Sequence, residues 1–210
     1  AGRDGPYRAA RLVQDAEFRR TPEATWGPMP AVQHMGLGQA GFVWDARAPG
    51  PVLPSFTVID AYVGGRGLLR ANLFGAIPVA HARGGVVDRA EAMRYLAELP
   101  WAPDAVLGNP DITWTVLEDD QIEAALETPS GRVAVRFTVD AEGDFAGMVT
   151  ERPDTRADGT EFTREWRGRY EEYQGIAGRR IPVAGEVGYV EDGAYWGYWR
   201  GRITDMELLR

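Results

Sequence analysis

The sequence predicts a mainly β protein: an antiparallel curved sheet or half-barrel of about 11–12 strands, with one or two helices inserted after the fifth strand. Three observations support this class. Short runs of alternating apolar and polar residues recur along the chain, turns rich in Gly, Pro and Asp separate them, and one stretch has helical spacing. We expect the 210 residues to form a single barrel-like domain, 1–210, with a loose N-terminus at 1–7 and a helical insert at 88–107.

Residues 56–74, FTVIDAYVGGRGLLRANLF, indicate a β-hairpin that reverses at Gly64 and Gly65. Both central residues of a tight two-residue turn need positive φ, which glycine adopts without strain. Such a turn sets the pairing register and places Asp60 and Tyr62 on the apolar face of the hairpin. We therefore expect one carboxylate on the core side of the sheet.

Before this hairpin, alternating residues predict strands at 11–19, 31–37 and 42–47, separated by prolines and glycines. The segment 75–85, which follows the hairpin, reads as irregular. The preceding strands place the hairpin within a wider sheet.

Asp88 and Glu91 have the spacing of a capping box, and apolar residues at helical spacing continue to Pro100. We expect a helix over 88–99, followed up to residue 107 by a buried connector that can include a short second helix.

The second half reads as one strand after another. The expected strands lie at 112–117, 121–127, 132–139, 145–151, 161–170, 181–190 and 195–208, and the segment 152–160 is expected to be an exposed polar loop. Strands joined by short turns form a meander, and so wide a sheet curls and can enclose a cavity.

Composition excludes several classes of function. The chain has no cysteine and no lysine, which excludes thiolate chemistry, disulfides, zinc–cysteine sites and an internal Schiff base. Its two serines lie outside a G-x-S-x-G motif, and its two histidines are far apart, so we expect no metal and no cofactor. The net charge of −8 argues against nucleic acid and against an anionic membrane surface as partners.

The start of the chain shows no apolar run of the signal-peptide kind, and no run approaches the length of a membrane-spanning helix. We therefore expect a cytoplasmic location. The absent initiator Met is compatible with processing or trimming, so secretion stays open.

Asp60, Tyr62 and His81 are the candidate catalytic residues. A carboxylate facing an apolar interior can act as a general acid or base, because burial raises the pKa of a carboxyl group. Tyr62 shares its face, and His81 is the better placed of the two histidines for proton transfer. The alternative is structural, with Asp60 held by an arginine or by backbone amides.

A second group of residues is expected to line a ligand cavity. It consists of Tyr95, Trp101, Trp166, Glu186, Trp196, Trp199 and Arg200. The tryptophans would form a wall for a flat or acyl ligand, although such aromatics are also typical of a core. Glu186 and Arg200 fall on adjacent predicted strands, so they form either a charged pair at the cavity mouth or a structural salt bridge.

Five motifs occur in order over roughly residues 41–205. They are GFVWDAR (41–47), DAYVGGRG (60–67), AMRYLAELPW (92–101), IPVAGEV within the run 170–189, and YWRGRITD (198–205). Together they resemble an uncharacterised bacterial family, a domain of unknown function. At fold level the pattern is similar to the open barrels that carry lipoproteins across the bacterial periplasm.

The resemblance implies no activity, so no catalytic role follows from it. It implies that certain residues occupy motif positions: Asp60, Tyr95, Trp101, Glu186, Arg200 and Asp205. Members of the family commonly have a helical segment before the first strand and an aromatic residue where Ala102 stands, and this sequence shows neither. The second difference affects the shape of any pocket near Trp101.

Three functions remain open at this stage. The leading hypothesis is the binding of an apolar small molecule or an acyl, lipid-like ligand in the barrel cavity. The first alternative is a cofactor-independent enzyme of the cyclase, isomerase or hydrolase type that uses acid–base residues in the same cavity. The second is an interaction module with a filled barrel and exposed aromatics at a protein interface.

Overall fold

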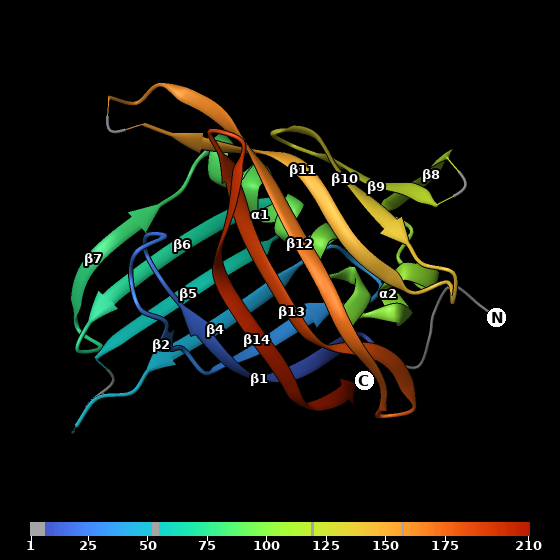
Figure 1. The fold of residues 1–210 in the computed structure, drawn as a ribbon, viewed down its shortest axis with the longest axis horizontal. Helices are drawn as coiled ribbons and strands as arrows, with labels where there is room; N and C mark the ends of the chain where they lie inside the picture. Colours follow the sequence, from blue (N-terminus) through green and yellow to red (C-terminus); the bar gives the residue numbers. More distant parts are fainter. Residues whose placement is uncertain (1–6, 52–54, 119, 157) are drawn as a thin grey trace.

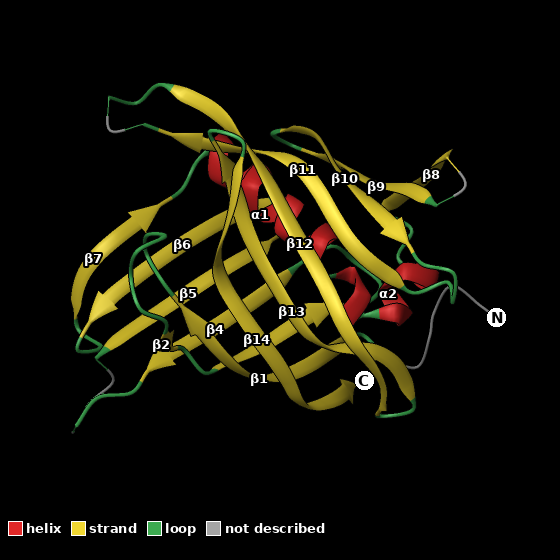
Figure 2. Ribbon diagram, in the orientation of Figure 1, coloured by secondary structure: helices red, strands yellow, loops and turns green. Residues whose placement is uncertain are grey.

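The computed structural model describes residues 7–51, 55–118, 120–156 and 158–210, so most of the predicted loose N-terminus lies outside the described residues. Within these ranges, thirteen strands follow one another in a single antiparallel sheet, and the short strand β2 pairs with β1 beside this path. The sheet curls into a half-barrel with the helices on its concave side (Figures 1 and 2). The predicted fold class is confirmed.

The elements follow in three groups along the chain. The first group contains β1 (Ala9–Phe18), β2 (Gly27–Pro28), β3 (Ala31–Gly36), β4 (Phe42–Ala48), β5 (Phe56–Val63), β6 (Arg66–Leu73) and β7 (Ile77–Ala82). The helical group contains α1 (Gly85–Ala97), the 3-10 helix η1 (Leu99–Trp101) and α2 (Pro103–Gly108). The last group contains β8 (Ile112–Glu118), β9 (Gln121–Thr128), β10 (Gly131–Val139), β11 (Phe145–Thr155), β12 (Glu161–Ile176), β13 (Arg179–Glu191) and β14 (Ala194–Leu209).

The order of strands across the sheet is β7-β6-β5-β4-β3-β1-β14-β13-β12-β11-β10-β9-β8. Neighbours in sequence are therefore neighbours in space almost throughout, as expected for a meander. The pairing of β1 with β14 joins the first and last strands in the middle of the sheet, with Ala9 opposite Leu209. β7 and β8 form its two edges.

The hairpin of β5 and β6 has the predicted turn. Gly64 and Gly65 have φ values of 59° and 79°, and Val63 pairs with Arg66. The register that follows buries Asp60, whose residue surface is 7% exposed. Local turn chemistry thus directs one carboxylate into the interior.

Two strands were missing from the prediction, so the strand count is higher than expected and the helices follow the seventh strand rather than the fifth. β2 has only two residues, and β7 lies in the segment expected to be irregular. Pro78 of β7 pairs with Asn72 next to a register irregularity. Proline is tolerated there because an edge strand leaves N–H groups outside the ladder and a bulge interrupts it.

The predicted capping role of Asp88 was wrong. α1 begins at Gly85, and no side chain caps its first turn. The Asp88 carboxylate instead accepts hydrogen bonds from the Gly67 N–H at 2.7 Å and the Ser130 hydroxyl at 2.8 Å. A Cβ on Gly67 would lie 2.5 Å from the Val87 carbonyl oxygen, so glycine permits this close approach of helix and hairpin.

The end of the helix also differs from the prediction. α1 ends at Ala97, and Pro100 lies in the following 3-10 helix rather than at the helix stop. The short second helix expected in the connector is present as α2.

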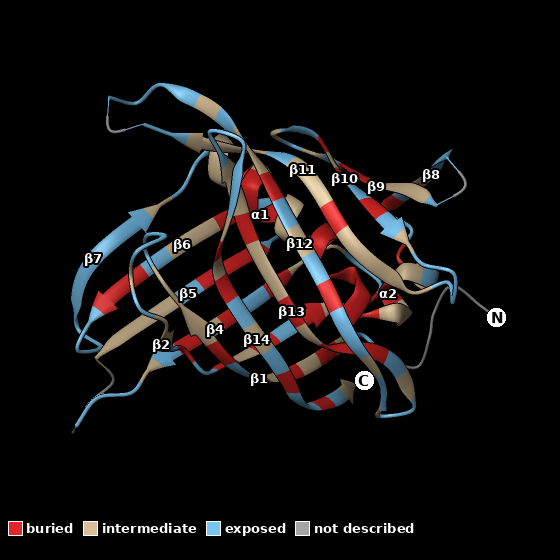
Figure 3. Ribbon diagram, in the orientation of Figure 1, coloured by how far each residue is buried: buried red, intermediate tan, exposed pale blue. Residues whose placement is uncertain are grey.

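α1 packs between the two ends of the curled sheet. It contacts β5 and β6 on one side and β9, β10 and β11 on the other. Buried and exposed residues alternate along many strands, as Figure 3 shows, so the concave face and the helix share one core. No helix within the described residues is long and apolar enough to span a membrane.

Candidate functional site: a cavity with a buried charged cluster

A cavity of about 1000 Å³ lies between the concave face of the sheet and α1. Its apolar lining includes Phe18, Met29, Phe56, Val58, Leu69 and Trp166. Small-molecule pockets usually measure about 300–1,000 Å³, so this one can hold a ligand of substantial length. The interaction-module alternative required a barrel filled by its own side chains. The cavity shows that this barrel is not filled.

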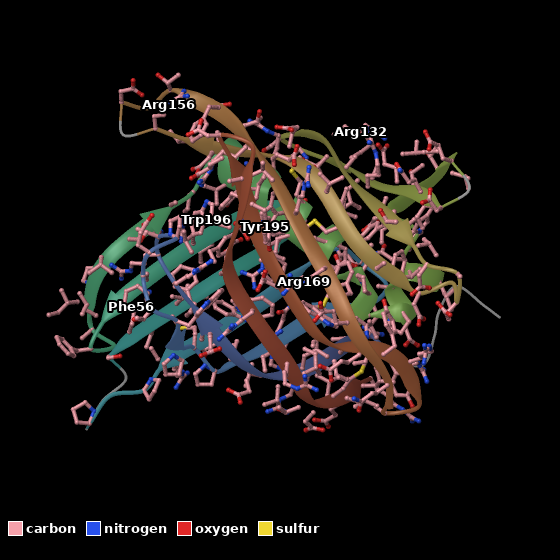
Figure 4. All side chains as sticks on the ribbon, in the orientation of Figure 1. Phe56, Arg132, Arg156, Arg169, Tyr195 and Trp196 are labelled. Atoms are coloured by element: carbon pink, nitrogen blue, oxygen red, sulfur yellow. The ribbon has the colours of Figure 1, made fainter. Side chains whose placement is uncertain are left out.

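Exposed lining residues mark the opening of this cavity. They are Arg20, Thr21 and Pro22 after β1, Val79 and Ala80 on β7, and Thr155 and Glu191 at the ends of β11 and β13. Figure 4 shows Phe56 at this end of the molecule and Arg132 at the opposite end. The mouth thus faces away from β8 and the second helix.

Arg94 of α1 holds two carboxylates at the inner wall of the cavity. Its Nη1 donates to Asp60 Oδ2, and its Nε donates to Glu98 Oε1 at 2.9 Å. The guanidinium also lies 4.9 Å from the Phe42 ring centroid and 4.8 Å from that of Trp44. Burial alone would lower the pKa of Arg94, but the negative charges of Glu98 and Asp60 outweigh it and raise the pKa.

Glu98 is further held by a chain of buried amides. The Gln33 amide donates to Glu98 Oε2, and the Gln14 amide donates to Gln33 Oε1 at 3.1 Å. The Trp44 indole N–H then donates to Gln14 Oε1 at 2.7 Å. Since both Glu98 oxygens have donors, this carboxylate serves as scaffolding for Arg94.

A second buried ion pair lies beside the first. Arg152 of β11 donates from Nη2 to Glu91 Oε1 at 2.9 Å, and its guanidinium lies 4.7 Å from the Trp166 ring centroid. Glu91 is also within hydrogen-bonding reach of Asp60. Burial and the negative charge of Asp60 raise the pKa of Glu91 well above its ordinary value, although Arg152 acts in the opposite direction.

One oxygen on each of two carboxyl groups lacks a donor among the described residues. These atoms are Oδ1 of Asp60 and Oε2 of Glu91. A buried oxygen without a donor is costly, and either a proton shared by the two carboxyls or a donor from a ligand would satisfy it. The pair therefore forms a polar recognition point on an otherwise apolar wall.

Comparison with known proteins identifies the family of this sequence and similar folds. A family of unknown function, DUF6544, matches residues 2–201. The chain belongs to this family. No curated protein matches its sequence.

The structure of this DUF6544 protein is similar to that of a LolA superfamily protein from Nitrosomonas europaea, with a TM-score of 0.52 and 12% identity over 98% of this chain and 88% of that chain. A putative outer membrane lipoprotein-sorting protein domain from Vibrio parahaemolyticus gives a TM-score of 0.55 and 10% identity over 98% and 87%. A DUF1329 family protein from Desulfovibrio piger gives 0.50 and 7% over 96% and 86%. The TM-scores show a shared fold despite the low identities, and the family and fold resemblances expected from the motifs are confirmed.

Of the three predicted catalytic residues, only Asp60 lines the cavity. Tyr62 shares its face but is buried nearer the turn, where burial followed by the charge of Asp88 raises the pKa of its hydroxyl. His81 is exposed on β7, because its neighbours Ala80 and Ala82 are the residues that face the cavity. The structure therefore does not bring the three together.

Four predicted tryptophans do line the cavity: Trp101, Trp166, Trp196 and Trp199. Trp101 contacts Trp199 edge-on with ring centroids 5.9 Å apart, and the Trp166 indole N–H donates to the Tyr198 hydroxyl at 3.1 Å. Within the described part of the chain, the other three indole N–H groups are buried without an acceptor. This wall is apolar but retains unused hydrogen-bond donors.

Tyr95 lies outside the cavity, although it was expected to line it. Its hydroxyl donates to the Gly36 carbonyl at 2.9 Å and accepts a hydrogen bond from the Asn109 side chain at 2.8 Å. These bonds fasten α1 to the end of β3 and to the segment after α2. Tyr95 is thus a structural anchor in this DUF6544 protein.

Glu186 and Arg200 also lie away from the cavity. They are opposite each other in the β13–β14 register, as expected, but each forms its ion pair with another neighbour. Glu186 contacts Arg169 at 3.4 Å and Arg200 contacts Glu17 at 2.6 Å. Because a strand residue has a cross-strand neighbour on either side, adjacency alone does not determine the partner.

Sequence reasoning missed most of the charged cluster. Glu91, Arg94 and Glu98 recur at spacings that place them on one helix face, and this signal was available in the sequence. Arg152 was missed because residues 152–160 were expected to be a loop, whereas β11 continues to Thr155. The extension of that strand carries Arg152 onto the cavity wall.

Proposed function

We propose that this protein binds an amphiphilic ligand, with an apolar chain in the cavity and a polar head at the cluster of Asp60, Glu91, Arg94 and Arg152. The observation that carries this proposal is the cavity itself, about 1000 Å³ in volume, with apolar walls that end at buried charged groups. Apolar surface provides affinity, while a few fixed polar groups orient a ligand.

The charges of the cluster favour a neutral head group. Arg94 is matched by Asp60 and Glu98, while the raised pKa of Glu91 favours its protonated form beside Arg152. With Glu91 protonated, the two arginines and the carboxylates of Asp60 and Glu98 sum to zero charge, so a fully charged head would leave the dry site with a net charge at a large desolvation cost. A hydroxyl, ester or amide can instead use the unpartnered oxygens of Asp60 and Glu91 and the free indole N–H groups.

The fold comparisons support an acyl-bearing ligand. Two similar structures are described as a LolA superfamily protein and a putative outer membrane lipoprotein-sorting protein domain. A half-barrel with a helix on its concave side suits a flexible apolar chain, because the chain can lie along the strands. We therefore extend the proposal to fatty acyl esters or amides as the ligand class.

Two measurements test the proposal. Solvent extraction of the purified protein followed by mass spectrometry should detect a co-purified amphiphile, and a fluorescent acyl ester should bind in titration. Ala80→Trp, at the mouth, should weaken that binding about tenfold by occupying space in the opening, whereas Val116→Trp on the exposed β8 surface should leave it unchanged. An empty extract with no binding of the acyl ester would refute the proposal.

A second candidate is acid–base catalysis in the same cavity. It is favoured by Glu91, whose raised pKa favours the protonated form beside a second carboxyl group, an arrangement suited to proton transfer. Incubation of the extracted amphiphile or an acyl ester with the protein, followed by mass spectrometry, should then show conversion. Asp60→Asn should abolish conversion while the fluorescent ester still binds; a wild type that leaves both the mass and the chromatographic retention of the ligand unchanged rejects catalysis.

A further inference from the structure

An exposed apolar surface lies at the turn between β6 and β7. We define the β6–β7 tip as Leu73, Phe74, Ile77 and Val79. Phe74 and Ile77 are each 57% exposed and Val79 is 47% exposed. Figure 3 shows β7 exposed along its length. Large apolar side chains gathered in this way mark an interaction site rather than an ordinary solvated edge.

This tip is continuous with the mouth of the cavity. Val79 belongs to both surfaces, and Ala80 beside it lines the cavity. Phe56, the cross-strand partner of Leu73, also lines the cavity. Whatever covers the tip therefore also covers one side of the opening.

The charge around the tip is opposite to that of the whole chain. Residues 68–82 contain Arg70 and His81 but no Asp or Glu, in a protein whose net charge is −8, whereas Arg66 and Arg83 lie at the other end of β6 and β7 beside Asp88. Arg70 is exposed beside His81 on the neighbouring strand, and the Arg20 guanidinium lies 5.2 Å from the Phe56 ring centroid. The tip is thus an apolar surface bordered by arginines.

The far side of the mouth has a different character. Arg164 there is paired with Asp154 and with Glu191, the latter at 3.1 Å. The charge of Arg164 on that side of the mouth is therefore balanced by carboxylates.

We propose that the β6–β7 tip docks on an anionic lipid surface. Phe74 and Ile77 enter the interface, while Arg70 and Arg20 lie near the head groups. This inference rests on the proposed function, because docking sets the cavity mouth against the bilayer from which an amphiphile would enter. The negative charge of the whole chain argues against such a surface, but the local charge of the tip decides which face approaches it.

Features of β7 disfavour a strand from another protein as the occupant. Pro78 lacks an N–H, and a register irregularity interrupts the pairing of β7 with β6 beside it. Both features weaken the edge as a template for strand addition. A lipid surface needs no such regular ladder.

Co-sedimentation with vesicles tests the docking. We expect the full chain to bind vesicles of phosphatidylcholine with about 30% phosphatidylglycerol and to bind phosphatidylcholine alone much more weakly. The double variant Phe74→Ser and Ile77→Ser should lose at least tenfold in affinity, because it removes the inserting groups. Each of Arg70→Gln and Arg20→Gln should lose about fivefold.

A matched double variant controls for general loss of surface apolarity. Leu107→Ser and Val116→Ser changes two exposed residues, on α2 and β8, and should bind vesicles as the wild type does. Failure of the wild type to bind anionic vesicles, or equal losses in the tip and control variants, would overturn the docking. A concentration-dependent dimer in analytical ultracentrifugation that the tip variant abolishes would also overturn it, in favour of a second copy.

Binding of the fluorescent acyl ester without vesicles separates this inference from the proposed function. The tip variant should bind the ester normally but no longer bind vesicles. This result supports both the docking and the proposed function. If the wild type binds the ester but does not bind vesicles, the docking alone is overturned. Vesicle binding without ester binding supports the docking and overturns the proposed function.

Discussion

Arginines and carboxylates form one row on the outer face of the sheet and one cluster inside it. The outer row runs Arg169, Glu186, Arg200 and Glu17 across β12, β13, β14 and β1, with charges alternating from strand to strand. The inner cluster consists of Asp60, Glu91, Arg94, Glu98 and Arg152. The residue types are the same, but the outer row meets solvent and the inner cluster lines a largely apolar cavity.

This difference teaches that burial, not residue type, separates scaffolding from a candidate site. Solvent screens the outer pairs, so each contributes little to the free energy of unfolding. Inside, burial and the charge of Asp60 together raise the pKa of Glu91 well above its ordinary value. The five predictions below follow from this contrast and from the buried carboxylates, in order of decreasing effect on stability.

Removal of the central arginine should have the largest effect. Arg94→Met would leave Asp60 and Glu98 buried without their cation and should lower the free energy of unfolding by about 3–5 kcal/mol. Arg200→Met in the outer row is the matched control and should cost at most about 1 kcal/mol. Chemical denaturation at neutral pH measures both, and equal losses would contradict the contrast.

Asp88→Asn should have the next largest effect, about 2 kcal/mol at neutral pH, because Asp88 ties α1 to the β5–β6 hairpin. Burial would raise the pKa of Asp88, but hydrogen bonds from Gly67, Ser130 and Arg66 outweigh it and lower the pKa. Its stabilising charge is therefore present above the ordinary pKa and lost as pH falls through the lowered value. The difference between wild type and variant should shrink in acid; a difference independent of pH would point to a different role.

Glu91 should produce the opposite pH dependence. Below its ordinary pKa of 4.5 the folded and unfolded states both hold the proton, and its contribution to stability is complete. As pH rises from there through the raised pKa of the folded state, the unfolded chain loses the proton first and stability falls. Glu91→Gln should remove about 1 kcal/mol of this decline, measured as unfolding free energy against pH.

The same carboxyl offers a direct check of its cause. Asp60→Asn removes the neighbouring negative charge and should lower the pKa of Glu91, followed by carbon-detected NMR of the labelled carboxyl. An unchanged titration would mean that burial alone perturbs Glu91.

The smallest effect is expected for Glu186→Gln. It breaks the contact with Arg169 and should change stability by less than about 1 kcal/mol. Affinity for the fluorescent acyl ester should not change, since Glu186 lies away from the cavity. A clear loss of ester binding would show that Glu186 contributes to the ligand site although it lies away from the cavity.

Much of the fold could be predicted because it depends on local chemistry. Two glycines with positive φ set the hairpin, and the alternation of residues along β5 then directs Asp60 inward. The failures have equally local reasons. Pro78 made the segment of β7 read as irregular. The spacing of Asp88 and Glu91 matched a capping box, although both carboxylates bind other parts of the sheet.

By itself, then, the sequence determined the curved antiparallel meander, the inward-facing Asp60 and the tryptophan wall, because turn residues and period-two patterns act over a few positions. Only the tertiary structure decided which charges share the cavity. Arg152 reaches Glu91 from 61 residues away, and Arg94 reaches Asp60 from 34. Their energies depend on how completely distant segments exclude water, and no local pattern encodes that exclusion.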